Sequence, residues 1–517
     1  MKNEKTSVFV RPVLTALLTL CFAFCILSLP SAFAQSAKSS KGSQAEKEVH
    51  SRQYIELLNS VYTFVLENYV DEVDPKILYE GALKGMMDAF EDPYTAYLGT
   101  AQMRDLNDTT TGDFGGVGLS ITKPAETSAD KPAYVEVVSP IEDTPGWRAG
   151  IQAGDLILSI DGTSTADITM EEVLKILRGP KGTSVNLIIR RGKTGEFPVS
   201  LIRAIIEVPT VKYGMINRGK QKTGYLRIIE FTPKTPDRVQ EALDSFKKAD
   251  FTSLIIDLRN NPGGLISSVA DVADKFIDTG VIVSTKSRLM FENSVYRAKP
   301  KATVMPKNIP IVVLINKGSA SASEILAGAL KDYHLAYLVG ERTYGKGSVQ
   351  QVVPLPNQDG IKLTMARYYT PSDSNIDKIG IPPDREIALP VLTEAEEKAY
   401  ASLITDEAIS KYVASNPNMS ASEIASYAHT LQSAYNLELR LLRRLIKLEV
   451  NRTKPAELYD LDFDVQLQAA LDIAASSNFE TMVKSAKTLK ELQASMSDEQ
   501  KVSAADGQAG KSGKKGR

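Results

Sequence analysis

A serine and a lysine that lie 25 residues apart are the side chains of this sequence best suited to covalent chemistry. Ser321 stands in "NKGSASASEILAGAL" (316–330), where an apolar strand ends, a glycine turn follows and an apolar helix begins. Such junctions expose a side chain at the carboxyl edge of a sheet, where α/β folds carry their sites. Because the first N–H groups of a helix are free, that of Ala322 would hold the oxyanion formed when Ser321 attacks a carbonyl group.

A serine nucleophile needs a neighbouring base, and Lys346 in "GERTYGKGSVQ" (340–350) is the candidate. The three histidines lie in a polar tether, a polar loop and a C-terminal helical segment, and none is well placed: His50, His334 and His429. Lysine can act as the base if its amine is neutral, which requires its pKa to fall from ~10.4 towards ~7, a change of about 4.6 kcal/mol. Burial away from carboxylates produces such a shift. Residues 345–350 contain no acidic side chain, and Gln350, on the same predicted strand face, would hydrogen-bond the amine without restoring its charge.

Plainer interpretations of both side chains stay open at this point. The segment "GERTYGKG" comes within one residue of a phosphate-binding loop, but Gly347 replaces the metal-binding hydroxyl. The β-branched residues that follow predict a strand where a phosphate loop needs a helix, so a nucleotide site is disfavoured. A surface turn remains the alternative for Lys346, and a helix-capping box, Ser321-x-x-Glu324, remains the alternative for the serine.

The composition is that of a globular chain, with 517 residues, 43% of them hydrophobic and 24% charged. The 61 basic and 63 acidic side chains nearly balance, so nothing favours nucleic-acid binding. Residues 1–34 are typical of a cleaved signal peptide, because basic residues precede an apolar run over 13–29 and "SAFAQ" offers a cleavage site. An uncleaved membrane anchor is the alternative, although the run is only 17 residues long. We therefore expect an exported protein, periplasmic or secreted, either free or associated with the membrane.

Both cysteines, Cys21 and Cys25, lie within the predicted signal peptide. The mature chain would then contain no cysteine. Disulfides, a thiol nucleophile and cysteine-bound zinc are excluded together on that prediction.

Changes in hydrophobic periodicity divide the mature chain into segments. Helical spacing of apolar residues predicts helices near both ends, and short β-branched runs predict a small β-rich domain. Continuous apolar strands that alternate with helices predict an α/β core whose parallel sheet is covered on both faces. The predicted division is a flexible tether over 35–53, an N-terminal helical region over 54–112, the β-rich domain over 113–205, the α/β core over 206–391, a C-terminal helical region over 392–495 and a disordered basic tail over 496–517.

Motifs along nearly the whole mature length resemble the carboxyl-terminal processing proteases, also called tail-specific proteases. The matching segments are "DPYTAYL" at 92–98, "FGGVGL" at 114–119, "AGIQAGDLILSIDG" at 149–162, "LIIDLRNNPGGL" at 254–265, "NKGSASASEILAGAL" at 316–330, "VGERTYGKGSVQ" at 339–350, "ARYYTPS" at 366–372 and "GIPPD" at 380–384. Their order, together with the interval from Ser321 to Lys346, is more specific than any single motif.

The resemblance implies a serine endopeptidase with a Ser/Lys dyad that cleaves protein substrates near their C-termini and uses no metal or cofactor. In that family the serine matching Ser321 is the nucleophile, the lysine matching Lys346 is the base, and the glutamine matching Gln350 supports the lysine. The implied core is a crotonase-like, or ClpP-like, α/β fold.

Two backbone sites are also implied. The glycines of "RNNPGG", Gly263 and Gly264, lie just past a parallel strand, where one of them would complete the oxyanion hole with Ala322, although a turn alone also explains two glycines. The β-rich domain resembles a PDZ domain, whose loop would capture a terminal carboxylate while the substrate tail adds a strand beside the 118–123 edge. The residues of that loop are Gly115, Gly116, Val117, Gly118 and Leu119.

The expected partners are protein substrates bound through their C-terminal tails, with a subunit-pairing role for the terminal helices and an adaptor or activating lipoprotein as further partners. A dimer or larger homo-oligomer follows from the resemblance. The main alternative function is a non-catalytic PDZ adaptor on a protease-like scaffold. Acyl-CoA chemistry on the related core fold is a weaker alternative.

Overall fold

The computed structural model describes residues 34–111, 113–124, 132–141, 144–152, 154–192, 195–207, 209–389, 392–451 and 457–495. The chain forms two compact units, Met1–Glu91 and Asp92–Arg517. The predicted tail over 496–517 and residues 1–33 of the predicted signal peptide lie outside the described residues. Among the helices of the described ranges, none combines the length and apolar character needed to cross a bilayer.

The first unit consists of two helices, α1 (Ala34–Asn68) and α2 (Pro75–Asp88). Helix α2 begins at a capped position, because the Asp74 side chain accepts from the Lys76 N–H and Pro75 occupies the first turn. Helix α1 corrects the predicted flexible tether over 35–53, since these residues are helical in the structure. Their small polar composition also contains good helix formers such as Ala, Gln, Glu and Lys, and the segment continues into the helix predicted from Tyr54 onward.

The β-rich part is built on an antiparallel sheet. Its strand order is β3-β4-β5-β7-β8, so β3 is an edge strand among the described elements, and β2 pairs separately with β9. Helix α5 (Met170–Leu177) begins at a complete capping box formed by Thr169 and Glu172. The other elements are β2 (Asp113–Gly116), β3 (Leu119–Thr122), β4 (Val135–Pro140), α4 (Pro145–Arg148), β5 (Leu156–Ile160), β6 (Thr163–Ser164), β7 (Ser184–Arg191), β8 (Gly195–Ile202) and β9 (Ala204–Glu207).

The larger core contains a six-stranded sheet in the order β10-β11-β12-β15-β16-β19. All neighbouring pairs are parallel except β10 with β11. The strands span β10 (Val211–Arg218), β11 (Gln221–Ile228), β12 (Ser253–Asp257), β15 (Ile311–Ile315), β16 (Tyr337–Gly340) and β19 (Arg385–Glu386).

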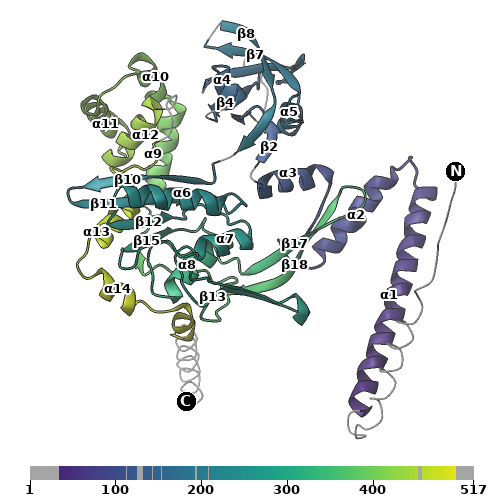
Figure 1. Cartoon of the computed structure of the whole chain (residues 1–517). Coiled ribbons are helices and arrows are strands. Elements are labelled where there is room, and N and C mark those ends of the chain that lie inside the picture. The colour runs from purple at the N-terminus through teal and green to yellow at the C-terminus, as the bar shows by residue number, and fades with distance from the viewer. Residues whose placement is uncertain are drawn as a thin grey trace, which may run out of the picture. The chain divides into compact units, whose positions relative to one another are not determined.

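Helices cover both faces of this sheet, as the continuous apolar strands predict (Figure 1). Leu254 and Ile256 pack on the side of α6 (Thr235–Lys248), α7 (Ile266–Ala273) and α8 (Ala322–Asp332). Ile255 packs on the opposite side, in a cluster with Leu471 of α13 (Val465–Ala474). The C-terminal region predicted over 392–495 therefore supplies one layer of the α/β core.

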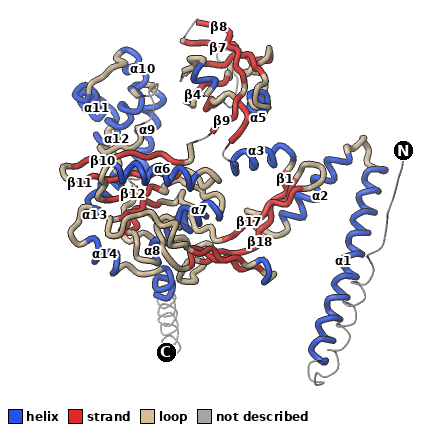
Figure 2. Tube along the Cα trace, in the orientation of Figure 1, coloured by secondary structure: helices blue, strands red, loops and turns tan. Residues whose placement is uncertain are grey.

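A second, antiparallel sheet is formed by β1, β18, β13 and β14, with β17 on β18 (Figure 2). Strand β1 (Ala96–Leu98) lies in the region predicted to be helical over 54–112, and the structure corrects that prediction here. Three residues carry too little pattern to predict a strand, and β18 supplies the pairing edge. The remaining bounds are α3 (Thr100–Thr111), β13 (Val281–Ser287), η1 (Met290–Glu292), β14 (Ser294–Arg297), β17 (Ser348–Pro354) and β18 (Gly360–Tyr369).

Four C-terminal helices share a separate apolar cluster that includes Leu403, Leu431, Leu442 and Ile446. They are α9 (Glu394–Thr405), α10 (Ala408–Ser415), α11 (Ala421–Tyr435) and α12 (Leu439–Val450). Helix α14 (Phe479–Ser485) follows α13, and its Phe479 packs beside the α13 cluster.

The position of α13 predicts a stability effect. Leu471→Ala should lower the free energy of unfolding of the core by about 2–5 kcal/mol, because a side chain that is 1% exposed leaves a cavity against the sheet. Urea unfolding of the mature chain measures this. The control Leu448→Ala on α12, at a side chain 58% exposed, should change it by less than about 0.5 kcal/mol. Equal midpoints for both variants would contradict the layer assigned to α13.

Candidate active site

Ser321 lies at the junction between β15 and α8, as the sequence predicts, and its backbone is strained. Its φ is +55° with ψ −115°, a conformation that costs a residue with a side chain roughly 1–3 kcal/mol. The ordinary capping residues Thr169, Thr393 and Ser420 all have φ −71° and accept a hydrogen bond through their side chains. Ser321 and Glu324 form the capping box that the sequence predicts, and the Glu324 carboxylate accepts from the Ser321 N–H. The positive φ, and the lack of a cap hydrogen bond to the Ser321 hydroxyl within the described residues, distinguish this serine from the other caps.

The Glu324 carboxylate joins the serine segment to the lysine segment. Oε2 accepts from the N–H of Ser321 and from the N–H of Lys346, both at 2.9 Å. Oε1 accepts from the N–H of Gly345 at 2.8 Å and from the Thr343 hydroxyl at 2.5 Å. Glu324 is fully buried, and burial raises the pKa of its carboxyl group while these hydrogen bonds oppose that rise. All four partners are donors, so the ionised carboxylate fits this position.

A tyrosine hydroxyl forms a second link between the same two segments. Tyr368 on β18 hydrogen-bonds the backbone carbonyl of Lys346 and that of Ser321, the latter at 3.2 Å. Its side chain is fully buried, so the ring position is fixed by packing. Glu324 and Tyr368 together hold both the N–H and the C=O groups of Ser321 and Lys346. The spacing between the two backbones is thereby defined.

The Lys346 amine is half-buried and lies over the ring of Tyr94, 4.9 Å from its centroid. Burial lowers the pKa of Lys346 and the nearby Lys362 lowers it further, whereas Asp92 and Glu324 act in the opposite direction. The prediction that no carboxylate lies near the Lys346 amine is therefore wrong. Asp92 and Glu324, which lie outside the segment 345–350, both act on it. Within the described residues no hydrogen bond joins the Lys346 amine to the Ser321 hydroxyl, and their pairing stays a prediction.

The glycine loop packs directly against the serine. A Cβ added at Gly263 would lie 2.8 Å from Cβ of Ser321, so this position excludes any larger residue. The Gly263 N–H already donates to Oδ1 of Asn261 at 2.8 Å. No hydrogen bond to a described residue engages the N–H of Gly264 or that of Ala322. These two groups are the available oxyanion donors, which sharpens the prediction that one glycine acts with Ala322.

Gln350 is held by hydroxyl groups in the structure. Its Nε2 lies 2.9 Å from Ser348 Oγ and 3.2 Å from Thr364 Oγ1. Thr364 in turn donates to Oδ2 of Asp92 at 2.6 Å. The contact between Gln350 and Lys346 that the resemblance implies stays a prediction.

The predicted carboxylate loop joins β2 to the edge strand β3. The carbonyls of Val117 and Gly118 accept from the N–H groups of Gly146 and Ile141, at 2.8 and 2.9 Å. Gly118 has φ +74°, and a Cβ there would collide with the Thr144 side chain, so glycine is required. Gly115, Gly116 and Leu119 complete the loop. Its peptide-binding role stays a prediction, supported by the unpaired edge of β3 among the described strands.

Other candidate side chains have structural partners. Ser319 and Ser323 donate their hydroxyls to the carbonyls of Leu258 and Asn261. A ring nitrogen of His334 lies 3.1 Å from the Val483 carbonyl, consistent with its assignment as an unsuitable base. In the described ranges no three His, Cys, Asp or Glu side chains gather as they would around a metal ion.

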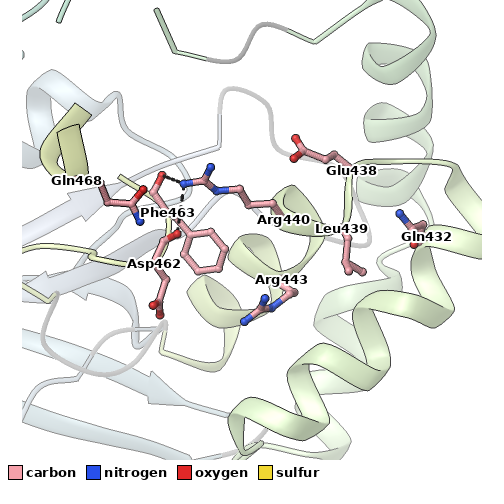
Figure 3. Close-up of a pocket in the computed structure, with 8 residues that line it drawn as sticks. All are labelled: Gln432, Glu438, Leu439, Arg440, Arg443, Asp462, Phe463 and Gln468. Atoms are coloured by element: carbon pink, nitrogen blue, oxygen red, sulfur yellow. Dashed lines mark hydrogen bonds between the residues drawn. The ribbon is translucent and has the colours of Figure 1, made fainter. Parts of the chain in front are cut away.

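A pocket of about 610 Å³ lies where α11, α12 and the start of α13 meet (Figure 3). Arg440 donates there to the carbonyls of Asp462 and Phe463, which occupies part of its guanidinium. None of the predicted site residues lines this pocket. Its open, polar lining offers no nucleophile with a base, so we assign it no catalytic role.

Sequence reasoning missed the roles of four residues that the structure brings to this site: Asp92, Glu324 as a bridge, Thr364 and Tyr368. Asp92 and Tyr368 do lie within "DPYTAYL" and "ARYYTPS", two of the motifs used for the resemblance. Their presence in these motifs was the available signal. The role of Asp92 depends on its hydrogen bond with Thr364, 272 residues away, and sequence spacing does not reveal such a contact.

Comparison with known proteins gives a consistent result. The model of peptidase family S41 matches residues 222–387, that of the PDZ domain matches 136–191, and that of the activating protease CtpB N-terminal domain matches 20–101. The carboxy-terminal-processing protease of Bartonella bacilliformis is 40% identical over 336 residues, covering 64% of this chain and 74% of the relative. The carboxy-terminal processing protease CtpA of Bacillus subtilis is 30% identical over 388 residues, covering 75% and 78%. Among solved structures, the photosystem II D1 C-terminal processing protease is 30% identical, with a TM-score of 0.39, and covers 65% of this chain and 94% of its own.

An α/β core with a serine at a strand–helix junction and a PDZ domain defines a class of serine-type peptidases. The chain belongs to peptidase family S41, the carboxyl-terminal processing proteases.

The Glu324 bridge predicts a large effect of a nearly isosteric change. Glu324→Gln should lower kcat by at least about 100-fold, because either orientation of the amide turns an NH₂ group toward two donors and displaces the site by a fraction of an ångström. It should also destabilise the core by roughly 1–3 kcal/mol for each donor left unpaired. Peptidase assays and urea unfolding measure both effects.

The matched control is Glu396→Gln, the same change at the same position of an exposed helix, where Glu396 caps with Thr393. This control should keep kcat unchanged. A fully active Glu324→Gln variant would show that the bridge does not position the site.

Proposed function

We propose that this peptidase works through a Ser/Lys dyad, with Ser321 as nucleophile and Lys346 as base, and cleaves proteins near their C-termini after its PDZ domain has captured the tail. The observation that carries the proposal is the Glu324 carboxylate, whose Oε2 holds the backbones of both residues at 2.9 Å. A scaffold that only bound peptides would have no reason to keep a strained serine, a buried amine and such a bridge together.

The chemistry follows in two halves. The neutral Lys346 amine takes the proton from Ser321 Oγ as that oxygen bonds to the scissile carbonyl carbon, and the N–H groups of Ala322 and Gly264 stabilise the oxyanion. The C–N bond then breaks, and Lys346 returns the proton to the leaving amine. Water attacks the acyl-enzyme, gives its proton to Lys346, and the ester bond to Ser321 breaks as its oxygen regains a proton. Gln350 would hold the amine during both halves.

The lysine must move for this cycle to begin. With its amine over the Tyr94 ring, Lys346 makes a cation–π contact that favours the charged form. In this proposal the side chain rotates toward Ser321, while Glu324 and Tyr368 hold the two backbones in place. Substrate binding would supply the displacement from Tyr94.

The predicted PDZ domain gives the reaction its preference for chain ends. A tail would add as a strand along β3, with its terminal carboxylate on the N–H groups of the loop from Gly115 to Leu119 and α5 as the other wall. We place the catalytic core in the crotonase-like, ClpP-like fold on the basis of its α/β layers and the resemblance.

We also propose that the protein is exported and works in the periplasm or outside the cell, with residues 1–34 as a signal peptide. Partners beyond the substrate would be a second copy of the chain and an adaptor or activating lipoprotein. The apolar faces of the terminal helices and the match at 20–101 to the activating protease CtpB N-terminal domain support this view.

Replacement of the nucleophile tests the function directly. Ser321→Ala should abolish cleavage of a quenched fluorescent peptide that ends in an apolar residue, while the variant still binds the peptide with the affinity of the wild type. Lys346→Ala should abolish cleavage as well, because the proposed mechanism gives the serine proton no other acceptor. Fluorescence turnover and anisotropy measure the two properties.

The same variants separate enzyme from adaptor. Undiminished cleavage by either variant would overturn the Ser/Lys assignment. Proteins captured by Ser321→Ala and identified by mass spectrometry would supply the substrates.

The charge environment of Lys346 predicts a pH effect. The amine must be neutral, so kcat/KM should rise with pH through the pKa of Lys346. Lys362 lowers this pKa, and Lys362→Met should therefore raise it and move the acid limb of the pH profile to higher pH. The control Lys398→Met, on exposed α9, should leave the limb in place. A limb that moved to lower pH in Lys362→Met would contradict Lys346 as the base.

A further inference from the structure

Asp92 and its hydroxyl partners form a hydrogen-bonded chain that ends at Gln350. Asp92 Oδ2 accepts from the hydroxyls of Thr364 and Thr95, at 2.6 and 2.7 Å, and Oδ1 accepts from the Tyr94 N–H at 3.0 Å. Thr364 Oγ1 then meets Nε2 of Gln350 at 3.2 Å. Burial raises the pKa of Asp92, but the hydrogen bonds from Thr364 and Thr95 outweigh it and lower that pKa below its usual value. Asp92 is therefore ionised at neutral pH.

The direction of every bond in this chain follows from that charge. An ionised carboxylate can only accept, so the single proton of the Thr364 hydroxyl must point to Asp92. Thr364 Oγ1 can then only accept from Gln350, and the amide must present its NH₂ group to Thr364. The second Nε2 proton goes to Ser348 Oγ at 2.9 Å. Both donors of Gln350 are engaged, which leaves its carbonyl oxygen for a donor such as the Lys346 amine.

A β-bulge brings Thr364 to this position. The pairing of β17 with β18 shifts register between Val349 and Gln350, so that Val349 lies opposite Ala366 and Gln350 lies opposite Thr364. A regular ladder would place Met365 opposite Gln350 and turn Thr364 to the other face. Bulges commonly redirect a side chain beside an active site. The one-residue shift puts a hydroxyl where the amide of Gln350 requires it.

We propose that Asp92 and Thr364 are positioning residues that fix the amide of Gln350 with its oxygen toward Lys346. This inference rests on the proposed Ser/Lys site. It adds the residues that orient Gln350, which would support the lysine. With the amide reversed, the NH₂ group would meet the lysine amine, two donors would face each other, and the lone pair of Lys346 would turn away from Ser321. A glutamine without this chain would populate both orientations.

The test is a double-mutant cycle on the mature chain with the quenched fluorescent peptide. Thr364→Val keeps the shape and removes the hydroxyl, and it should lower kcat by about 10- to 100-fold with little change in KM. In the Gln350→Glu background the same change should lower kcat less than twofold, because a carboxylate presents an oxygen in either orientation. An equal loss in both backgrounds, or no loss in either, would overturn the inference.

The pH profile supplies a readout that a simple packing defect would not move. The groups that face Lys346 are Lys362, Asp92, Glu324 and the Tyr94 ring. Thr364→Val exposes the protonated amine to the NH₂ group of Gln350, so the acid limb should move to lower pH. Asp92→Asn should move the limb in the same direction, because it removes a negative charge and allows the chain to reverse. If the acid limb of the pH profile stayed unchanged in both variants, the proposed hydrogen-bonded chain from Asp92 to Gln350 would be contradicted.

Two control variants show whether a loss of activity comes from a general loss of structure. Thr364→Ser restores the hydroxyl and should recover at least half of the wild-type kcat. Thr100→Val removes a comparable bond, in which the Thr100 hydroxyl donates to Oδ1 of Asp359 at 2.8 Å, and should keep kcat and the acid limb. If Thr364→Val is fully active while Lys346→Ala is inactive, the orienting chain is wrong and the Ser/Lys site stands. If Lys346→Ala is active, the proposed function itself fails.

Discussion

The buried Glu324 carboxylate is the interaction on which the rest of the site depends. It collects four donors from three places in the chain: Ser321 at the start of α8, Thr343 beyond β16, and the Gly345–Lys346 turn before β17. An ionised group taken out of water is stable only when its lone pairs are satisfied, so these segments cannot separate without leaving a buried charge unpaired. The proposed nucleophile and base are thus held together through their backbones, and their side chains remain free to react.

This arrangement explains how strain and burial coexist at one place. Ser321 keeps a positive φ because the helix behind it, the bridge beside it and the Gly263 loop against it determine its backbone from three sides. Lys346 shows the complementary balance, in which burial favours the neutral amine while Asp92, Glu324 and the Tyr94 ring favour the charged one. A balance of this kind can be shifted by a bound substrate.

Segments distant in the sequence meet at the lysine. Asp92 and Tyr94 immediately precede strand β1, and the pairing of β1 with β18 brings them to the edge of β18. The bulge in β18 turns Thr364 toward Gln350. Helix α13 closes the opposite face of the core sheet from the C-terminal region. The core is therefore assembled from both ends of the second unit. The edge of β3, unpaired among the described strands, leaves the PDZ domain with a place for an incoming chain.

The sequence by itself determined the α/β core, the strand after Lys346 and the junction that carries Ser321, because these depend on local periodicity and on motifs with fixed spacing. Only the tertiary structure decided that Glu324 is a bridge, that Gly264 has the free N–H and that carboxylates approach Lys346. These features depend on which donors and acceptors the fold brings together, and such hydrogen-bond competition leaves no periodic pattern in the sequence.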